Sequence, residues 1–269
     1  MHAFSSIRNA AWLASLAWSL SGCVGTTGGD VFPFEAYASG PPGADGSSYS
    51  FESLGYDVTL VRAKVHVGAA YLNRAVPTSG AGLDTSCTLA GIYSAEVAAE
   101  LEVDALSPVP QAFPALGQAT SDASFTGEIW LNHGDIDDPS SDTVILDVQG
   151  RAEKSGEVFE FEGALTIGDN RLRSAPPQTP GAHPICKERV VTPIAVNVVP
   201  ERGGSLTLQI DPARMFANVD FARLTPSPDG TYVFDDERET EDHPVDQPSK
   251  ALYQGLRSTA SYEFSWRQP

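Results

Sequence analysis

The sequence predicts an all-β fold, either an antiparallel β-sandwich or a Greek-key barrel of about nine strands with one or two short helices. Apolar and polar residues alternate with a period of two along most of the chain, and the helical period is scarce. The 24 glycines and 20 prolines are spread between the alternating segments. Turn-forming residues between many short alternating runs are typical of an antiparallel all-β domain.

The longest alternating segment, residues 59–71, predicts a strand with an apolar and a polar face. The apolar face is expected to carry Val61, Ala63, Val65, Val67, Ala69 and Tyr71. The polar face carries Arg62, Lys64 and His66. Further strands are expected at residues 92–103, 125–131, 144–152, 158–167, 190–199, 206–210 and 232–234. The chain ends in a strand with an aromatic face made of Tyr262, Phe264 and Trp266.

Turn and capping residues predict how some of these segments are joined. Lys154-Ser155-Gly156 is expected to close a hairpin over residues 144–167, and Arg202-Gly203-Gly204 a second hairpin over residues 190–210. A short helix is expected at residues 211–216, because Asp211 is a good N-cap and Pro212 suits the first turn. A second helix is expected at residues 248–256.

The N-terminus has the layout of a secretory signal. Arg8 precedes an apolar stretch that is too short for a membrane span, which needs roughly 20 residues. The stretch ends in Leu20-Ser21-Gly22-Cys23, which resembles the lipobox of bacterial lipoproteins. The resemblance covers only these first 23 residues. It implies diacylglycerol on the Cys23 sulfur, cleavage before Cys23 and acylation of the new N-terminus. The alternative is an ordinary secretory signal with a chance cysteine.

The resulting domain organisation has three parts. Residues 1–22 form the signal peptide, residues 23–48 a lipidated cysteine with a glycine-rich tether, and residues 49–269 a single β domain, onto which residues 32–37 can dock. Residue 24 is Val instead of the Asp that resembles an inner-membrane retention signal in many Gram-negative bacteria. This favours the outer membrane, at its periplasmic face or at the cell surface.

The three cysteines are placed by the same reasoning. With Cys23 assigned to the lipid, Cys87 and Cys186 remain as an even pair in an oxidising compartment, which favours a disulfide. It would close a loop of about 100 residues, for which the chain-entropy estimate is at most ~4.7 kcal/mol. The alternative is two free thiols that act as metal ligands.

Charge and motifs exclude several functions. The net charge of −18 makes nucleic acid and anionic lipid poor partners, so membrane contact is expected only through the lipid anchor. The chain has no G-x-S-x-G, P-loop, G-x-G-x-x-G, H-E-x-x-H or C-x-x-C motif. Glu160 and Glu162 lie roughly 7 Å apart on one strand face, where we expect them to face solvent.

Metal binding is a weaker hypothesis with two possible ligand sets. Ca²⁺ could bind the oxygen-rich loop that contains Asp135, Asp137, Asp138 and Asp142. A transition metal would need His66 or His133 to meet other ligands in the fold. The alternatives are a solvated turn and ordinary hydrogen-bonded histidines. The acidic run at residues 235–242 is expected to be a polar loop.

These observations predict a non-enzymatic module of the cell envelope that binds a protein, a glycan or a small ligand, with no cofactor expected. A metal-handling periplasmic protein is one alternative, which requires histidines to converge with carboxylates. A glycan-active enzyme is another, which requires a deep cleft lined by a carboxylate with an apolar neighbour.

Overall fold

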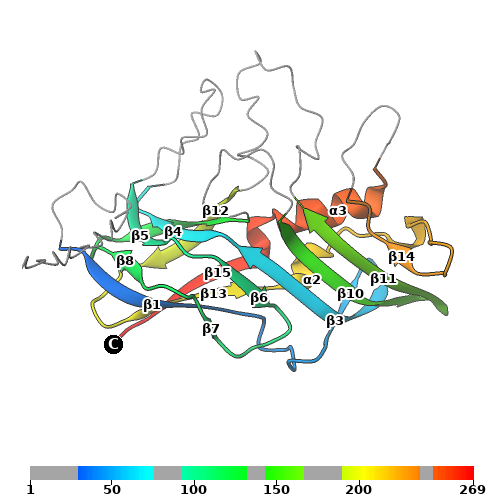
Figure 1. Ribbon diagram of the computed structural model, residues 1–269, viewed down its shortest axis with the longest axis horizontal. Coiled ribbons are helices and arrows are strands. Elements are labelled where there is room, and N and C mark those ends of the chain that lie inside the picture. The colour runs from blue at the N-terminus through cyan, green and yellow to red at the C-terminus, as the bar shows by residue number, and fades with distance from the viewer. Residues whose placement is uncertain (1–29, 76–91, 132–142, 167–189, 237–244) are drawn as a thin grey trace, which may run out of the picture.

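The predicted all-β class is confirmed by a computed structural model, which describes residues 30–75, 92–131, 143–166, 190–236 and 245–269. The described residues form fifteen strands and two short α-helices (Figure 1). The strands are β1 (Phe32–Ser39), β2 (Tyr49–Ser53), β3 (Tyr56–Val67), β4 (Ala69–Asn73), β5 (Tyr93–Val97), β6 (Leu101–Asp104), β7 (Gln111–Ala112), β8 (Gly117–Ala119), β9 (Ser124–Trp130), β10 (Val144–Lys154), β11 (Glu157–Thr166), β12 (Val190–Val198), β13 (Ser205–Ile210), β14 (Tyr232–Val233) and β15 (Tyr262–Arg267). The helices are α2 (Pro212–Met215) and α3 (Gln247–Leu256).

Two mixed sheets make up this architecture. The larger sheet has the strand order β12-β9-β4-β5-β8-β1-β13-β15, with β7 also paired to β1. Its first and last strands, β12 and β15, pack against each other, so this sheet is a nearly closed barrel. The smaller sheet has the order β14-β11-β10-β3-β2, with β6 also paired to β3. The pairs β1–β13 and β11–β14 are parallel, and the other strand pairs described are antiparallel.

One glycine allows the barrel to close. Gly127 of β9 points into the barrel, where a Cβ atom would lie 2.3 Å from Cδ2 of Phe264 on β15. Any larger residue would therefore overlap the ring. Phe264 is buried in the hydrophobic core and fills this space between the two ends of the sheet.

Strand β3 runs directly into β4 at Gly68, and the chain passes there from the smaller sheet to the larger one (Figure 1). The predicted single strand at residues 59–71 is therefore two strands. The side-chain alternation also changes twice along it. A bulge where β3 faces β10 leaves Val61 55% exposed, and the step at Gly68 turns Ala70 and Leu72 toward the core in place of Tyr71. The predicted polar positions of Arg62, Lys64 and His66 on β3 are correct.

The predicted hairpin of β10 and β11 is confirmed. The two strands pair along their length, and Ser155 and Gly156 form the turn with φ angles of 55° and 86°. Positive φ at both central residues is the geometry of a two-residue type I′ turn, which Gly adopts without steric cost. Phe159 and Phe161 face the core, as the alternation predicts.

The second predicted hairpin, over residues 190–210, is wrong. Strand β12 pairs with β9, whereas β13 pairs with β1 and β15. The turn at residues 201–204 joins the two strands but does not make them neighbours in the sheet. Turn residues predict that the chain reverses, and they do not specify which strand the next segment will join.

The predicted start of the β domain at residue 49 is also wrong. Strand β1 lies inside the larger sheet, between β8 and β13, and Phe32, Phe34, Ala36 and Ala38 belong to the core. Residues 32–39 are thus an integral strand and not part of a tether.

Both predicted helices are present, and they cover the inner face of the smaller sheet. Asp211 caps α2 by accepting a hydrogen bond from the Ala213 amide, and Asp246 caps α3 by accepting one from the Ser249 amide at 2.7 Å. A cluster of aromatic rings lies between these segments and the sheet, formed by Tyr56, Phe159, Phe161, Phe216, Phe221 and Phe234. No helix in the described part of the chain is long and apolar enough to span a bilayer.

Candidate functional site

The outer face of β4, β5 and β9 carries a cluster of polar and aromatic side chains. Along β4, Ala70 and Leu72 point into the hydrophobic core, so Tyr71 and Asn73 point to the opposite side of the sheet. In the ladder, Tyr71 lies opposite Glu96 of β5 on one side and Glu128 of β9 on the other. Two carboxylates therefore flank one tyrosine across three neighbouring strands.

Two further rings complete this cluster. The Tyr71 ring centroid lies 4.7 Å from that of Tyr93 and 5.0 Å from that of Trp130. The three rings thus form a continuous aromatic strip that crosses the row of carboxylates at Tyr71. We call this surface the Tyr71 face, and it consists of Tyr71, Asn73, Tyr93, Glu96, Glu128 and Trp130.

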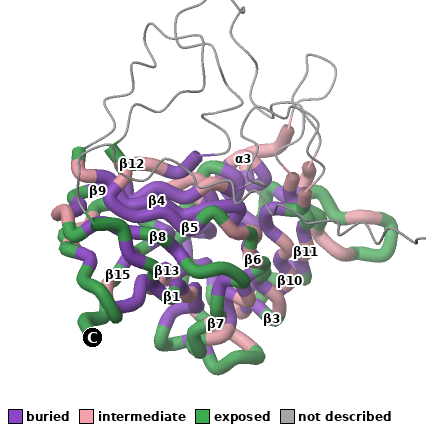
Figure 2. Tube along the Cα trace, turned by 60° about the vertical axis from the view of Figure 1, so that its left-hand side comes forward, coloured by how far each residue is buried: buried purple, intermediate pink, exposed green. Residues whose placement is uncertain are grey.

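The polar groups of the Tyr71 face are buried, and several have no partner. Glu128 and Asn73 are 0% exposed, and Tyr71 and Glu96 are 9% exposed; Figure 2 shows β4 in purple along its length. Trp130 Nε1 donates a hydrogen bond of 2.6 Å to Glu128 Oε1. Glu128 Oε2 and both polar atoms of the Asn73 side chain make no hydrogen bond of normal geometry.

Thr192 of β12 adds another unpaired polar atom next to this row. The ladder between β12 and β9 is regular at Val191–Ile129 and at Ile194–Gly127, and a bulge lies between these pairs. Thr192 is in that bulge, across from Glu128, and its hydroxyl is buried with no hydrogen-bond partner. Buried polar atoms are normally paired, so several unpaired ones in one place need an explanation.

Burial also changes the ionisation of these groups. Burial raises the pKa of the Glu128 carboxyl above its ordinary value, while the Trp130 donor and the nearby Asn73 amide act in the opposite direction. Burial likewise raises the pKa of Glu96. The pKa of Tyr71 is raised to about 12, first by burial and then by the negative charges of Glu96 and Glu128. Among the described ion pairs, none joins either carboxylate to a cation.

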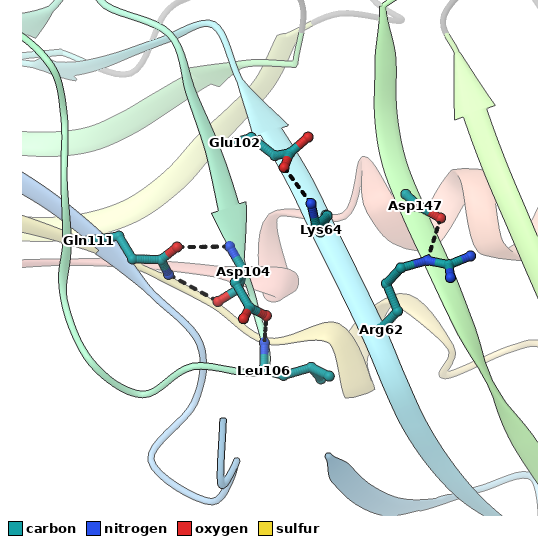
Figure 3. A network of polar contacts seen from close by, with 7 residues as sticks. All are labelled: Arg62, Lys64, Glu102, Asp104, Leu106, Gln111 and Asp147. Atoms are coloured by element: carbon teal, nitrogen blue, oxygen red, sulfur yellow. Dashed lines mark hydrogen bonds and ion pairs between the residues drawn. The ribbon is translucent and has the colours of Figure 1, made fainter. Parts of the chain in front are cut away.

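The outer face of the smaller sheet differs from the Tyr71 face, because its cations are paired with carboxylates. Lys64 of β3 lies 2.7 Å from Glu102 of β6, and Arg62 of β3 lies 2.8 Å from Asp147 of β10 (Figure 3). In the same view Gln111 of β7 holds the backbone of Asp104 by two hydrogen bonds of 2.9 and 3.0 Å. This network joins four strands, and its third carboxylate, Asp104, accepts a hydrogen bond from the Leu106 amide at 3.0 Å.

A shallow groove of about 460 Å³ also crosses this outer face, lined in part by Thr59, Val61, Gln149, Arg151, Glu160 and Glu162. The predicted solvent exposure of Glu160 is confirmed, and its carboxylate lies 3.6 Å from the Arg151 guanidinium. Glu162 is half-buried. Since the groove is open and its exposed carboxylate, Glu160, is paired with Arg151, the groove is not a candidate binding site.

The predicted metal ligands are only partly described. His66 is on the outer face of β3, with its side chain 15% exposed and Nε2 3.7 Å from Glu100 Oε2. Within the described ranges, no group of three or more His, Cys, Asp or Glu side chains is arranged to hold a metal ion. The remaining predicted site residues lie outside the described residues: Cys23, Cys87, Cys186, His133, Asp135, Asp137, Asp138 and Asp142.

The acidic run at residues 235–242 is described only at its start. Asp236 accepts hydrogen bonds from the backbone amide and the hydroxyl of Thr166, at 2.7 and 2.8 Å. Asp236 therefore secures the end of β11.

Glu96 and Glu128 were not predicted as site residues from the sequence, although a signal for them exists. Each is an acid with two non-polar neighbours in its strand, Ala95 and Val97 in one case and Gly127 and Ile129 in the other. In an alternating strand such a position also fits a solvent-exposed residue, and only the structure shows that these two are buried.

The chain has no significant match in comparisons with protein-family models, with curated proteins or with solved structures.

Proposed function

We propose that this protein is a lipid-anchored component of the bacterial cell envelope whose β domain binds a ligand at the Tyr71 face without catalysing a reaction. The observation that carries the proposal is the burial of Glu96 and Glu128 beside aromatic rings, with Glu128 Oε2 left unpaired. A buried, unsatisfied acceptor costs about 1–3 kcal/mol, and more if it is charged. A ligand that supplies the missing partners would recover this free energy.

The ionisation of the two carboxyls supports binding over glycan hydrolysis. Hydrolysis by a pair of carboxyl groups needs one proton donor and one ionised partner, so their environments must move their pKa values apart. In the Tyr71 face, burial raises the pKa of both Glu96 and Glu128. Both pKa values move in the same direction and for the same first cause, which does not favour a division into a proton donor and an ionised partner.

The position of β1 supports a short connection to the membrane. Strand β1 begins at Phe32, nine residues after Cys23. Fully extended, nine residues span at most roughly 30 Å. If Cys23 carries the lipid, the binding domain stays close to the membrane surface, and the outer membrane is the location that Val24 favours. The net charge of −18 would keep the domain from adhering to anionic lipid.

The anchor is tested by metabolic labelling with palmitate in a bacterial host. We expect the full chain to incorporate label and to fractionate with membranes, and the Cys23→Ala variant to lose both properties. A labelled Cys23→Ala variant, or an unlabelled wild-type chain, would contradict the anchor.

The binding role is tested on the full chain in an uncharged detergent, by thermal-shift measurements with three probe classes: alkylammonium salts, neutral sugars and divalent cations. We expect at least one class to raise the Tm of the wild type and not that of Glu128→Gln. Glu160→Gln is the matched control, because it removes an acid from an exposed position on a strand of the other sheet. A Tm that no probe changes, or turnover of a glycan by the protein, would contradict the proposal.

A further inference from the structure

We infer that the ligand of the Tyr71 face presents an alkylammonium group, which binds over the Tyr71 ring between Glu96 and Glu128. This inference rests on the proposed binding function and names the chemical class of the ligand.

The Tyr71 face carries two carboxylates and no described cation. Glu96 and Glu128 flank Tyr71 in the ladder. The negative charge of both carboxylates raises the pKa of Tyr71 and of Tyr93. No cation is among the described neighbours that affect the ionisation of either carboxyl. The group missing from this site is therefore a positive charge.

The aromatic strip of the Tyr71 face suits a cation that carries an alkyl chain. A cation within about 6 Å of a ring centroid is attracted by the negative face of the ring, most strongly by Trp and also by Tyr. Tyr93, Tyr71 and Trp130 lie in contact, with centroid separations of 4.7 and 5.0 Å, so they offer adjoining rings to the alkyl part of a ligand. A carboxylate pair combined with aromatic rings suits an organic cation better than a neutral sugar, which would leave the charges unmatched.

The spacing of the two carboxylates disfavours a bare metal ion. Glu96 and Glu128 are on strands separated by β4, so their backbones are about 10 Å apart at the usual strand spacing. The Tyr71 side chain stands between them. Ca²⁺ needs six or more oxygens at about 2.3–2.6 Å, and two carboxylates on either side of a ring do not supply that shell.

The unpaired buried atoms of the Tyr71 face are mostly hydrogen-bond acceptors. Glu128 Oε2, Asn73 Oδ1 and the Thr192 hydroxyl can all accept hydrogen bonds and make none of normal geometry, whereas Asn73 Nδ2 is the one unpaired atom among them that can only donate, and it acts on Glu128. An alkylammonium group carries up to three N–H donors and no acceptor. A quaternary ammonium would satisfy the charge but would leave these acceptors unpaired.

The test is calorimetric titration of the full chain with n-butylammonium, and with 1-butanol as the uncharged probe of the same length. We expect n-butylammonium to bind at least about tenfold more tightly than 1-butanol and than tetramethylammonium. Glu128→Gln should lower the affinity for n-butylammonium about tenfold, and Tyr71→Leu should lower it by a similar factor. Glu160→Gln should leave this affinity unchanged.

The possible failures separate the two proposals. Equal affinity for n-butylammonium and 1-butanol, or an unchanged affinity in Glu128→Gln, would overturn the alkylammonium assignment. Binding of a neutral sugar or of Ca²⁺ that Glu128→Gln abolishes would also overturn it, while supporting the broader binding function. If none of these probes binds the wild type, both proposals are wrong.

Discussion

Replacing Glu128 with glutamine tests whether burial of this carboxylate lowers the stability of the folded protein. Glutamine keeps an oxygen that can accept the 2.6 Å hydrogen bond from Trp130 Nε1. Its amide nitrogen is a new donor beside the Asn73 side chain, whose Oδ1 makes no hydrogen bond of normal geometry in the wild type. The substitution removes a buried charge without creating a cavity, so we expect it to stabilise the ligand-free protein at pH 8.

The size of this effect follows from the unpaired Glu128 Oε2. A buried acceptor without a partner costs about 1–3 kcal/mol, of which the glutamine should recover at least about 1 kcal/mol. For a domain of this size, 1 kcal/mol corresponds to a rise in Tm of about 2–4 °C.

The effect should depend on pH in one direction. The folded-state pKa of Glu128 is raised, so below its unfolded value the carboxyl is protonated in both states and carries no charge penalty. As pH rises through the unfolded and then the folded pKa, the wild type loses stability that Glu128→Gln does not lose. The advantage of the variant should therefore be smallest near pH 4 and should grow toward pH 8.

Urea unfolding of both proteins at pH 4, 6 and 8 measures this difference. Glu160→Gln, which removes an exposed carboxylate on β11, should change the unfolding free energy by less than about 0.5 kcal/mol at each pH. The reasoning is refuted if Glu128→Gln is less stable than the wild type at pH 8, or if its advantage does not vary with pH.

Three further predictions concern the fold. Gly127→Ala should lower the unfolding free energy by about 1–3 kcal/mol because its Cβ would overlap Phe264, and the double variant with Phe264→Leu should recover part of that loss in urea titrations. Asp246→Ala should cost about 1 kcal/mol by removing the cap of α3, and an unchanged urea midpoint would contradict the assigned cap. Cys87 and Cys186 are predicted to form a disulfide, so intact mass spectrometry should show a gain of two hydrogens on reduction; free thiols before reduction would disprove it.

Local sequence signals predict the local parts of this fold well. The hairpin of β10 and β11 follows from alternation on both sides of a Ser155-Gly156 turn, and both helices follow from an aspartate cap before a proline. These features depend on residues that are close together in the chain. Their physical causes, namely turn geometry and capping, act over a few residues.

The wrong predictions arise where the partner is distant in sequence. Nothing near β12 specifies that it pairs with β9 in place of β13. A bulge at Val61 and the step at Gly68 each change which residues face the core, and a strict period of two cannot anticipate either. Tyr71 was therefore predicted on the core side of its strand.

The candidate site could be predicted only in fragments for the same reason. Tyr93 and Trp130 are recognisable as aromatic residues of separate strands, but their contact with Tyr71 depends on the order β5-β4-β9. The burial of Glu96 and Glu128 depends on the tertiary structure, which alternation does not reveal.

The continuity of β3 and β4 at Gly68 has a consequence for how the protein responds to its ligand. Backbone amides of a single run from Tyr56 to Asn73 hold both sheets together, with the Gly68 amide itself donating to the Trp130 carbonyl at 2.7 Å. A ligand that steadies Tyr71 and Trp130 would restrain this run near its β4 end. Slowed deuterium uptake should then extend beyond the contact residues along β3, so that occupancy at one end of the molecule becomes measurable at the other.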